Sequence, residues 1–235
     1  YILNDPYCGG THLPDITLFI PVYAEARVVA FSVATVHHQD VGGMAPGSIP
    51  TNAIEIYQEG LRIPPLKYIE AGKLNETLDQ ILRYNIRLPD TFMGDLNAQL
   101  AACTVGARRL GELCQIHGAA NITRIFELLL DRSEAMTRAA LRTLPEGTYH
   151  YVDWLDNDGV VLDQKVRIEV AVTIKDGSIH FDFTGTDPQV RGPMNCVPSG
   201  SRAAAYYAVR ALTDAQIPTN GGCFRPVSLH LPEGS

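Results

Sequence analysis

The chain has 235 residues, of which 46% are hydrophobic and 19% charged, and its formal net charge at pH 7 is −7. This composition is typical of a globular protein with a substantial buried core. Because lysine and arginine form no cluster, we expect no nucleic-acid partner. The apolar runs are too short to span a bilayer, so we expect no membrane partner either.

The five cysteines show no disulfide framework. Cys103 and Cys114 fall in one predicted helix, roughly 16 Å apart at 1.5 Å rise per residue, which is too far to bridge. An odd count without framework spacing indicates reduced thiols and a cytoplasmic protein. Cys8, beside a Gly-Gly pair, is a candidate nucleophile or, alternatively, a small buried thiol.

The first sub-region, residues 1–70, is expected to hold strands and loops. Residues 16–22 and 28–36 are β-branched and bounded by turns, which predicts an antiparallel hairpin. Side chains alternate between the faces of a strand, so His37 and His38 point in opposite directions if the second strand extends that far.

The rest of this sub-region is rich in turns. Residues 41–50 read as a Gly/Pro-rich loop, and residues 53–66 are expected to hold one or two short strands, at 55–57 and 61–63.

The middle sub-region, residues 71–145, is expected to be helical. The predicted helices cover residues 74–85, Pro89 to about His117, and Asn121 or Thr123 to about Arg142.

The last sub-region, residues 146–235, is expected to hold β hairpins and one helix, because its apolar residues alternate. The predicted elements are strands over 149–154, 166–174 and 179–183, a helix over 199–213 and a strand over 226–231. Together the sub-regions predict an α+β fold in which antiparallel hairpins and sheets flank a central block of long helices. The chain opens and closes on apolar strands, so we expect residues 1–235 to be an internal portion of a longer polypeptide.

Two glycine-rich loops place histidine and aspartate near the ends of the first hairpin. His12 and Asp15 lie three residues apart, and His37 returns after the hairpin. Imidazole and carboxylate together suit Zn or Mn, and three protein ligands leave positions open for water or substrate. The loops therefore predict a catalytic metal site, with ordinary polar turns as the alternative.

Further polar residues are candidates for the same site. Asp40, like Asp5, is a possible fourth ligand or a group that orients an imidazole. Asp95 and Gln99 lie one helical turn apart and either contact a ligand or buttress the metal loop. Alternatively, Asp95 complements the helix N-terminus and Gln99 is solvated. Asn220 opens another Gly-Gly loop, which is either a contact for an anionic or amide substrate or a tight turn.

The whole chain resembles the hydantoinase B/oxoprolinase family, whose members are about twice this length. The segments that carry the resemblance are 4–15, 37–48, 94–99, 182–186 and 225–227. The resemblance implies an ATP-dependent ring-opening amidohydrolase of the hydantoinase, 5-oxoprolinase or lactamase type, acting on a small cyclic amide. It also implies a hetero-oligomer with a hydantoinase A-type partner, separate or fused, which holds ATP and Mg. The absence of a P-loop or G-x-G-x-x-G motif agrees with a nucleotide site outside this chain.

Related enzymes are ATP-dependent ketone carboxylases, whose corresponding subunit holds a metal, often manganese. Their ligand pattern falls on His12, Asp15 and His37 of this chain, and we expect His38 or Asp40 to act as the base. Three alternatives stay open: a carboxylase subunit, distinguished by bicarbonate dependence; a non-catalytic structural subunit; and a stand-alone metal hydrolase that needs no ATP.

Overall fold

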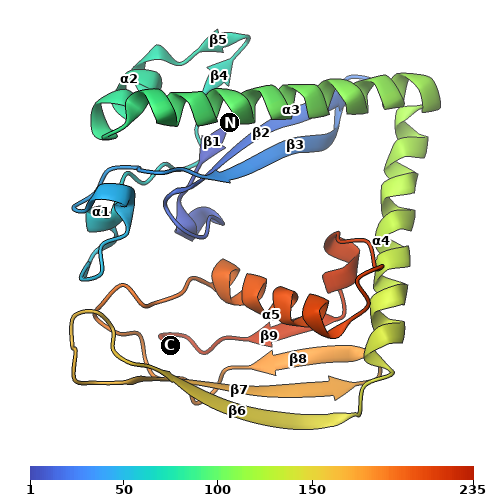
Figure 1. Cartoon of the computed structure of the whole chain (residues 1–235). Helices are drawn as coiled ribbons and strands as arrows, with labels where there is room; N and C mark the ends of the chain where they lie inside the picture. Colours follow the sequence, from blue (N-terminus) through green and yellow to red (C-terminus); the bar gives the residue numbers. More distant parts are fainter. The chain divides into compact units, whose positions relative to one another are not determined.

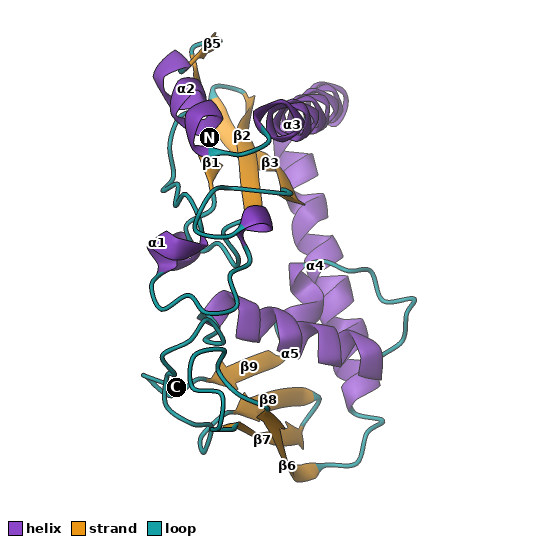
Figure 2. Cartoon of the chain, turned by 60° about the vertical axis from the view of Figure 1, so that its left-hand side comes forward, coloured by secondary structure: helices purple, strands orange, loops and turns teal.

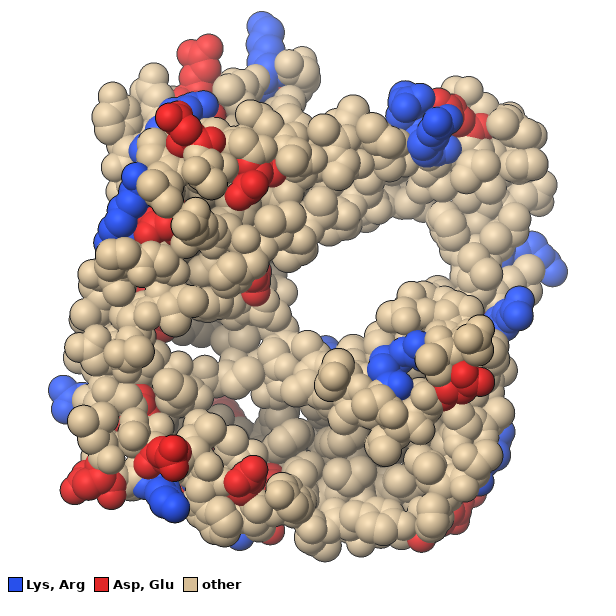
Figure 3. All heavy atoms as spheres, in the orientation of Figure 1, with Lys and Arg blue, Asp and Glu red and all other residues tan.

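The computed structural model describes residues 1–235 and contains both helices and sheets, which confirms the predicted α+β class (Figure 1). The chain divides into two compact units, Tyr1–Thr123 and Arg124–Ser235. No helix combines the length and apolarity needed to cross a lipid bilayer. Acidic and basic side chains are intermingled on the face drawn in Figure 3.

An antiparallel sheet packed against one long helix forms the core of the first unit (Figures 1 and 2). The sheet has the order β1-β2-β3, and the helix is α3. The elements are β1 (Ile2–Leu3), β2 (Asp15–Ala24), β3 (Arg27–His37) and α3 (Pro89–His117). Ile16 and Leu18 of β2 are buried together with Phe92 and Leu96 of α3, so one face of the sheet is covered by the helix.

The hairpin β2–β3 is present as predicted and is closed by a two-residue turn. Glu25 and Ala26 both adopt positive φ, 52° and 60°, which is the conformation of a type I′ turn. The register of the ladder shifts by one residue between Val22 and Tyr23, and beyond this irregularity the final pair of the ladder is Asp15 with His37.

The segment over residues 53–66 contains a helix instead of the predicted strands at 55–57 and 61–63. Glu55 and Gln58 form a capping box, which starts the short helix α1 (Ile56–Glu59). The Ile63 carbonyl accepts from the backbone N–H groups of Asn4 and Asp5, and the Leu61 N–H donates to the Val41 carbonyl, so residues 61–63 form no ladder. The remaining elements of this part are η1 (Pro6–Cys8), η2 (Pro46–Ser48), β4 (Ile69–Glu70) and β5 (Lys73–Leu74).

The predicted helices are present, with two corrected starts. α2 spans Glu76–Asn85 because Asn75 caps it through the backbone N–H of Leu78. α4 (Ala119–Leu141) begins before Asn121, because Gly118 adopts a positive φ of 82° and the chain turns there within one residue.

The second unit is a four-stranded sheet with one packed helix. The strands, in the order β6-β7-β8-β9, are β6 (Gly147–Leu155), β7 (Val166–Lys175), β8 (Ser178–Asp182) and β9 (Val227–His230). α5 (Pro198–Leu212) packs Ala205 and Val209 against Ile179 and Phe181. The pairing of β8 with β9 is parallel, not antiparallel, since the connection between them passes through α5. Before β9, the loop contains η3 (Gly221–Phe224).

Candidate metal centre

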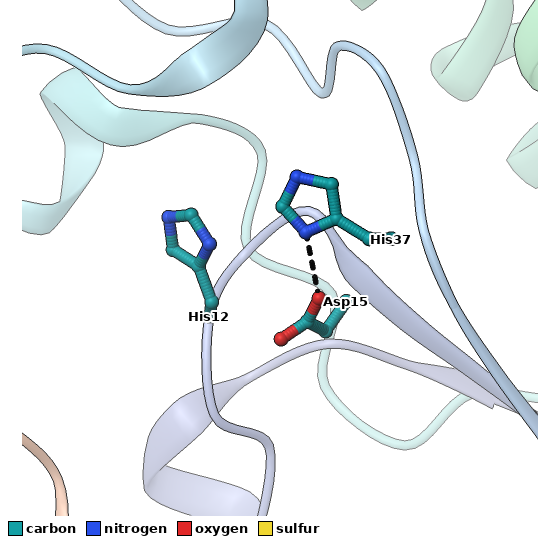
Figure 4. Close-up of side chains that lie close together, drawn as sticks. All are labelled: His12, Asp15 and His37. Atoms are coloured by element: carbon teal, nitrogen blue, oxygen red, sulfur yellow. Dashed lines mark hydrogen bonds and ion pairs between the residues drawn. The ribbon is translucent and has the colours of Figure 1, made fainter. Parts of the chain in front are cut away.

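The three predicted metal ligands lie together at the open end of the hairpin (Figure 4). Asp15 and His37 are directly opposed in the ladder, and the Oδ1 atom of Asp15 is 2.8 Å from Nδ1 of His37. The turn that precedes β2 brings His12 to the same place, with the Asp15 N–H donating to the His12 carbonyl at 2.9 Å. Thr11 donates to the other Asp15 oxygen at 2.8 Å, so the carboxylate is held from two sides.

The donor set fits a divalent metal ion. One ligand atom from each of His12, Asp15 and His37 lies within 4.8 Å of the others. His12 and Asp15 are partly buried, and His37 is exposed, which leaves one side of the cluster open to water or substrate. Two imidazoles and a carboxylate suit Zn or Mn, and an open side is typical of a catalytic site.

His38 points to the opposite face of the hairpin from His37, as the strand alternation predicts. It is fully buried, and its Nε2 donates to Oε1 of Gln99 at 2.8 Å. The orientation of the Gln99 amide is set by its Nε2, which donates to the carbonyls of Ile16 and Ala34. Nδ1 of His38 is buried and has no hydrogen-bond partner.

The environment keeps His38 neutral. Burial lowers the pKa of His38, and the Gln99 bond and the charge of Asp95 oppose this only in part. The alternative that Gln99 is solvated is wrong, because its side chain is 2% exposed and joins β2, β3 and α3.

Asp40 holds the glycine loop that follows β3. Its carboxylate accepts bonds of 2.9 Å from the N–H groups of Gly42 and Gly47 and from the Arg87 guanidinium. Burial acts to raise the pKa of Asp40, but these bonds, led by that from Gly42, outweigh it and lower the pKa. Arg87 also donates to loop carbonyls, namely those of Gly42, Gly43 and Ala45.

The other candidates are placed as follows. Asp95 is partly buried on α3, and its charge acts to raise the pKa of His38. Asp95 does not lie in the first turn of α3, where the acidic residue is Asp90. Asn220 lies in the second unit, where it accepts from the Gly222 N–H and donates to Ser133. Cys8 is exposed, so the expectation of a buried thiol is wrong.

Two residues that sequence reasoning passed over shape this site. Asn4 is completely buried, and its Nδ2 donates to the carbonyls of Leu13 and Leu61 at 2.7 and 2.8 Å. The Asn4-Asp5-Pro6 sequence is typical of a turn, so this role of Asn4 becomes visible only in the folded structure. Glu59, at the end of α1, interacts electrostatically with His12; burial raises the pKa of Glu59 and His12 partly offsets this. No local pattern marks Glu59, because its partner lies 47 residues earlier in the chain.

Comparison with known proteins relates the chain to one protein family. The sequence matches the family described as Hydantoinase B/oxoprolinase over residues 1–235. It is 36% identical over 244 residues to the B-type chain of a putative D-/L-hydantoinase of Pseudomonas sp. strain NS671, covering 99% of this chain and 41% of that relative.

Two solved structures share the fold. The ATP-dependent caprolactamase from Pseudomonas jessenii superposes with a TM-score of 0.91 at 32% identity, covering 100% of this chain and 40% of that one. A nucleotide-free acetone carboxylase gives a TM-score of 0.92 at 19% identity, covering 100% of this chain and 32% of that one, which shows a common fold.

Proposed function

The chain belongs to the hydantoinase B/oxoprolinase family, and we propose that it forms the metal-dependent catalytic part of an ATP-dependent, ring-opening amidohydrolase. The proposed substrate is a small cyclic amide of the hydantoin, 5-oxoproline or lactam type. The observation that carries this proposal is the cluster of His12, Asp15 and His37 at the end of the hairpin. Relatives named as a putative hydantoinase and a caprolactamase support the substrate class.

The chemistry of the amide explains why such an enzyme would use ATP. Resonance makes an amide a poor electrophile, so phosphorylation of its oxygen would activate the ring toward attack by water. We propose that a hydantoinase A-type partner, holding ATP and Mg, phosphorylates the lactam oxygen, and that this chain receives the activated ring. The working enzyme would then be a hetero-oligomer. Five free cysteines fit a reducing compartment, and we propose a cytoplasmic location.

Each residue of the metal centre has a proposed role. His12, Asp15 and His37 would hold Mn or Zn, which when bound lowers the pKa of a water ligand and polarises an oxygen under attack. Asp15 also orients the His37 ring by a hydrogen bond to Nδ1 of His37, and the Thr11 hydroxyl orients the Asp15 carboxylate in turn.

His38 and Asp40, the two bases predicted from the sequence, differ in how free each is to accept a proton. Nδ1 of His38 has a free lone pair but is enclosed, whereas the Asp40 carboxylate is committed to Arg87 and the glycine loop. Both remain predictions. We propose Asp95 as a substrate contact, and Gln99 as a residue that positions His38 through the hydrogen bond between them. Asn220, whose amide bonds to Gly222 and Ser133 within the second unit, stays a prediction.

The proposal is tested with His12→Ala, assayed with the nucleotide-binding partner. Removing one imidazole should abolish metal binding and ring opening, while ATP hydrolysis by the partner continues at least in part. The measurement is product amine and ADP release in parallel. Full ring opening by a metal-free variant would contradict the proposal, as would turnover without ATP.

A further inference from the structure

Arg62 has a guanidinium group whose terminal N–H groups are not used within the chain. Its side chain is 35% exposed, and its one ionic contact is with Asp5, whose Oδ2 lies 3.5 Å from Nε of Arg62. The Arg62 side chain donates no hydrogen bond within the chain, whereas other arginines of the first unit each donate to a carboxylate, namely Arg83, Arg87, Arg108 and Arg109. The planar fork of a guanidinium matches the paired oxygens of a carboxylate or phosphate, so Arg62 offers a free donor pair to a ligand.

Two tyrosine rings hold this guanidinium. Its central carbon lies 5.7 Å from the ring centroid of Tyr7 in η1 and 5.6 Å from that of Tyr57 in α1. Both distances fall within the range of cation–π attraction, which extends to about 6 Å. Both tyrosines are exposed. The side chains of Tyr7, Tyr57 and Arg62, which we call the Arg62 site, therefore combine a fixed cation with ring surfaces that a ligand can reach.

The backbone of Arg62 is fixed by Asn4. The Asn4 side chain donates to the Leu61 carbonyl at 2.8 Å and accepts from the Ile63 N–H at 2.6 Å, so both neighbours of Arg62 are held. The same amide donates at 2.7 Å to the carbonyl of Leu13, which belongs to the loop of the metal ligands. The segment that carries Arg62 therefore adjoins that loop, and its backbone is already ordered before a ligand binds, which lowers the entropic cost of binding.

We propose that the Arg62 site binds an oxyanion, a phosphoryl or carboxylate group, through paired hydrogen bonds from the terminal nitrogens of Arg62. The Asp5 carboxylate faces Nε, so the terminal N–H groups are left for the ligand. A cationic ligand is disfavoured, because the Asp5 side chain is only 9% exposed and already accepts from the Tyr7 N–H.

The assignment of this oxyanion to the ring substrate rests on the proposed function. Activation by the partner would give the ring a phosphoryl group, and 5-oxoproline carries a carboxylate of its own. Arg62 would hold the charged group of the ring while the metal centre acts on its carbonyl carbon. The shared amide of Asn4 ties the two segments together. Binding of an oxyanion at the Arg62 site does not itself depend on ring opening.

The experiment titrates inorganic phosphate, and separately acetate, into protein stripped of metal, so that neither anion can bind to a metal ion. Broadening of the anion's NMR signal reports binding. Wild type should bind, and Arg62→Gln should bind about tenfold to a hundredfold more weakly, because charged donors are lost. Arg62→Lys keeps the charge without the fork and should fall between the two. Arg27→Gln, at an exposed arginine that begins β3, is the matched control and should bind as wild type does.

The two anions distinguish the two sources of the oxyanion. Tighter binding of phosphate than of acetate would assign the site to the phosphoryl group. With the partner and ATP, Arg62→Gln should then continue to release ADP while opening fewer rings. Tighter binding of acetate would assign the site to a carboxylate, and Arg62→Gln should then raise KM for 5-oxoproline more than it lowers kcat.

Two outcomes would overturn the inference: metal-free wild type that binds neither anion, and Arg62→Gln that is folded by circular dichroism and binds both anions as tightly as wild type. Tyr57→Leu keeps the cation and removes one ring, so it serves if Arg62→Gln does not fold. It should bind phosphate about twofold to fivefold more weakly, and unchanged binding would equally overturn the inference. The titrations use no metal, ATP or partner, so a wild type that binds the anion but opens no ring contradicts only the proposed function.

Discussion

At the scale of single residues, the hydrogen-bonded pair of His38 and Gln99 supports the metal centre from the buried face of the hairpin. Gln99 reaches from α3 to both strands of the hairpin, and His38 is the next residue after the ligand His37. The proposed metal ligands on the exposed face of the hairpin are therefore supported by buried hydrogen bonds on the opposite face. Each of these bonds restrains the end of β3 that carries His37.

Replacing Gln99 with Leu should destabilise the fold by about 1–3 kcal/mol, because His38 Nε2 and two strand carbonyls lose their partner. The measurement is urea unfolding followed by circular dichroism. Gln80→Leu, at an exposed position of α2, provides the control and should change stability little. Equal stability of the Gln99 variant and wild type would show that the network is not needed.

The ion pair of Asp40 and Arg87 should make the free energy of unfolding depend on pH. Asp40→Asn should cost about 1–3 kcal/mol at pH 7, because the Arg87 guanidinium and two loop N–H groups lose a charged acceptor. The folded pKa of Asp40 is lowered from 3.8, so its stabilisation is complete above about pH 4 and is lost as the pH falls through the folded pKa.

The corresponding measurement is the unfolding free energy of wild type and Asp40→Asn between pH 7 and pH 3. The difference between them should shrink at the acid end. A difference that is constant over this range would show that the carboxylate charge makes no contribution.

At the scale of elements, the loop before β9 is held on α4 by a close backbone approach. A Cβ atom on Gly222 would lie 2.0 Å from the Leu130 carbonyl oxygen, and Asn220 of the same loop donates to Ser133 of α4. This contact positions the strand that pairs in parallel with β8.

Gly222→Ala should therefore destabilise the second unit by about 1–3 kcal/mol or more through steric conflict. Gly111→Ala, in the interior of α3 with no atom within 4 Å of the added Cβ, should instead stabilise by about 0.5–1 kcal/mol. Thermal unfolding of both variants tests the pair. A Gly222→Ala protein as stable as wild type would mean that η3 does not depend on this approach.

Long elements with strong end signals were predictable from the sequence. Pro89 and Gly118 bound α3 as predicted, and β-branched runs gave the hairpin that holds the metal ligands. α1 was not predicted, because one capped turn produces too few residues for a helical period. The parallel pairing of β9 depends on where α5 returns the chain, which no local pattern encodes.

At the scale of the whole molecule, all the predicted site residues except Asn220 fall in the first unit. The grouping of His12, Asp15 and His37 was predictable because the hairpin returns the chain to the start of its first strand, whereas the exact pairing of Asp15 with His37 also depends on the register shift between Val22 and Tyr23. The positions of Gln99, Arg87 and Glu59 were not, because each depends on packing between segments distant in sequence. The chain spans 41% of the length of its hydantoinase relative, so the activity of the whole enzyme stays a proposal.

The central claim is that His12, Asp15 and His37 bind a catalytic metal ion, and metal content by inductively coupled plasma mass spectrometry tests it most directly. Wild type should contain close to one Mn or Zn per chain, and His150→Ala, at an exposed position of β6, should match it. His12→Ala and His37→Ala should lose the metal while their circular dichroism is unchanged. A folded wild-type protein that holds no metal after reloading with Mn and Zn would contradict the account.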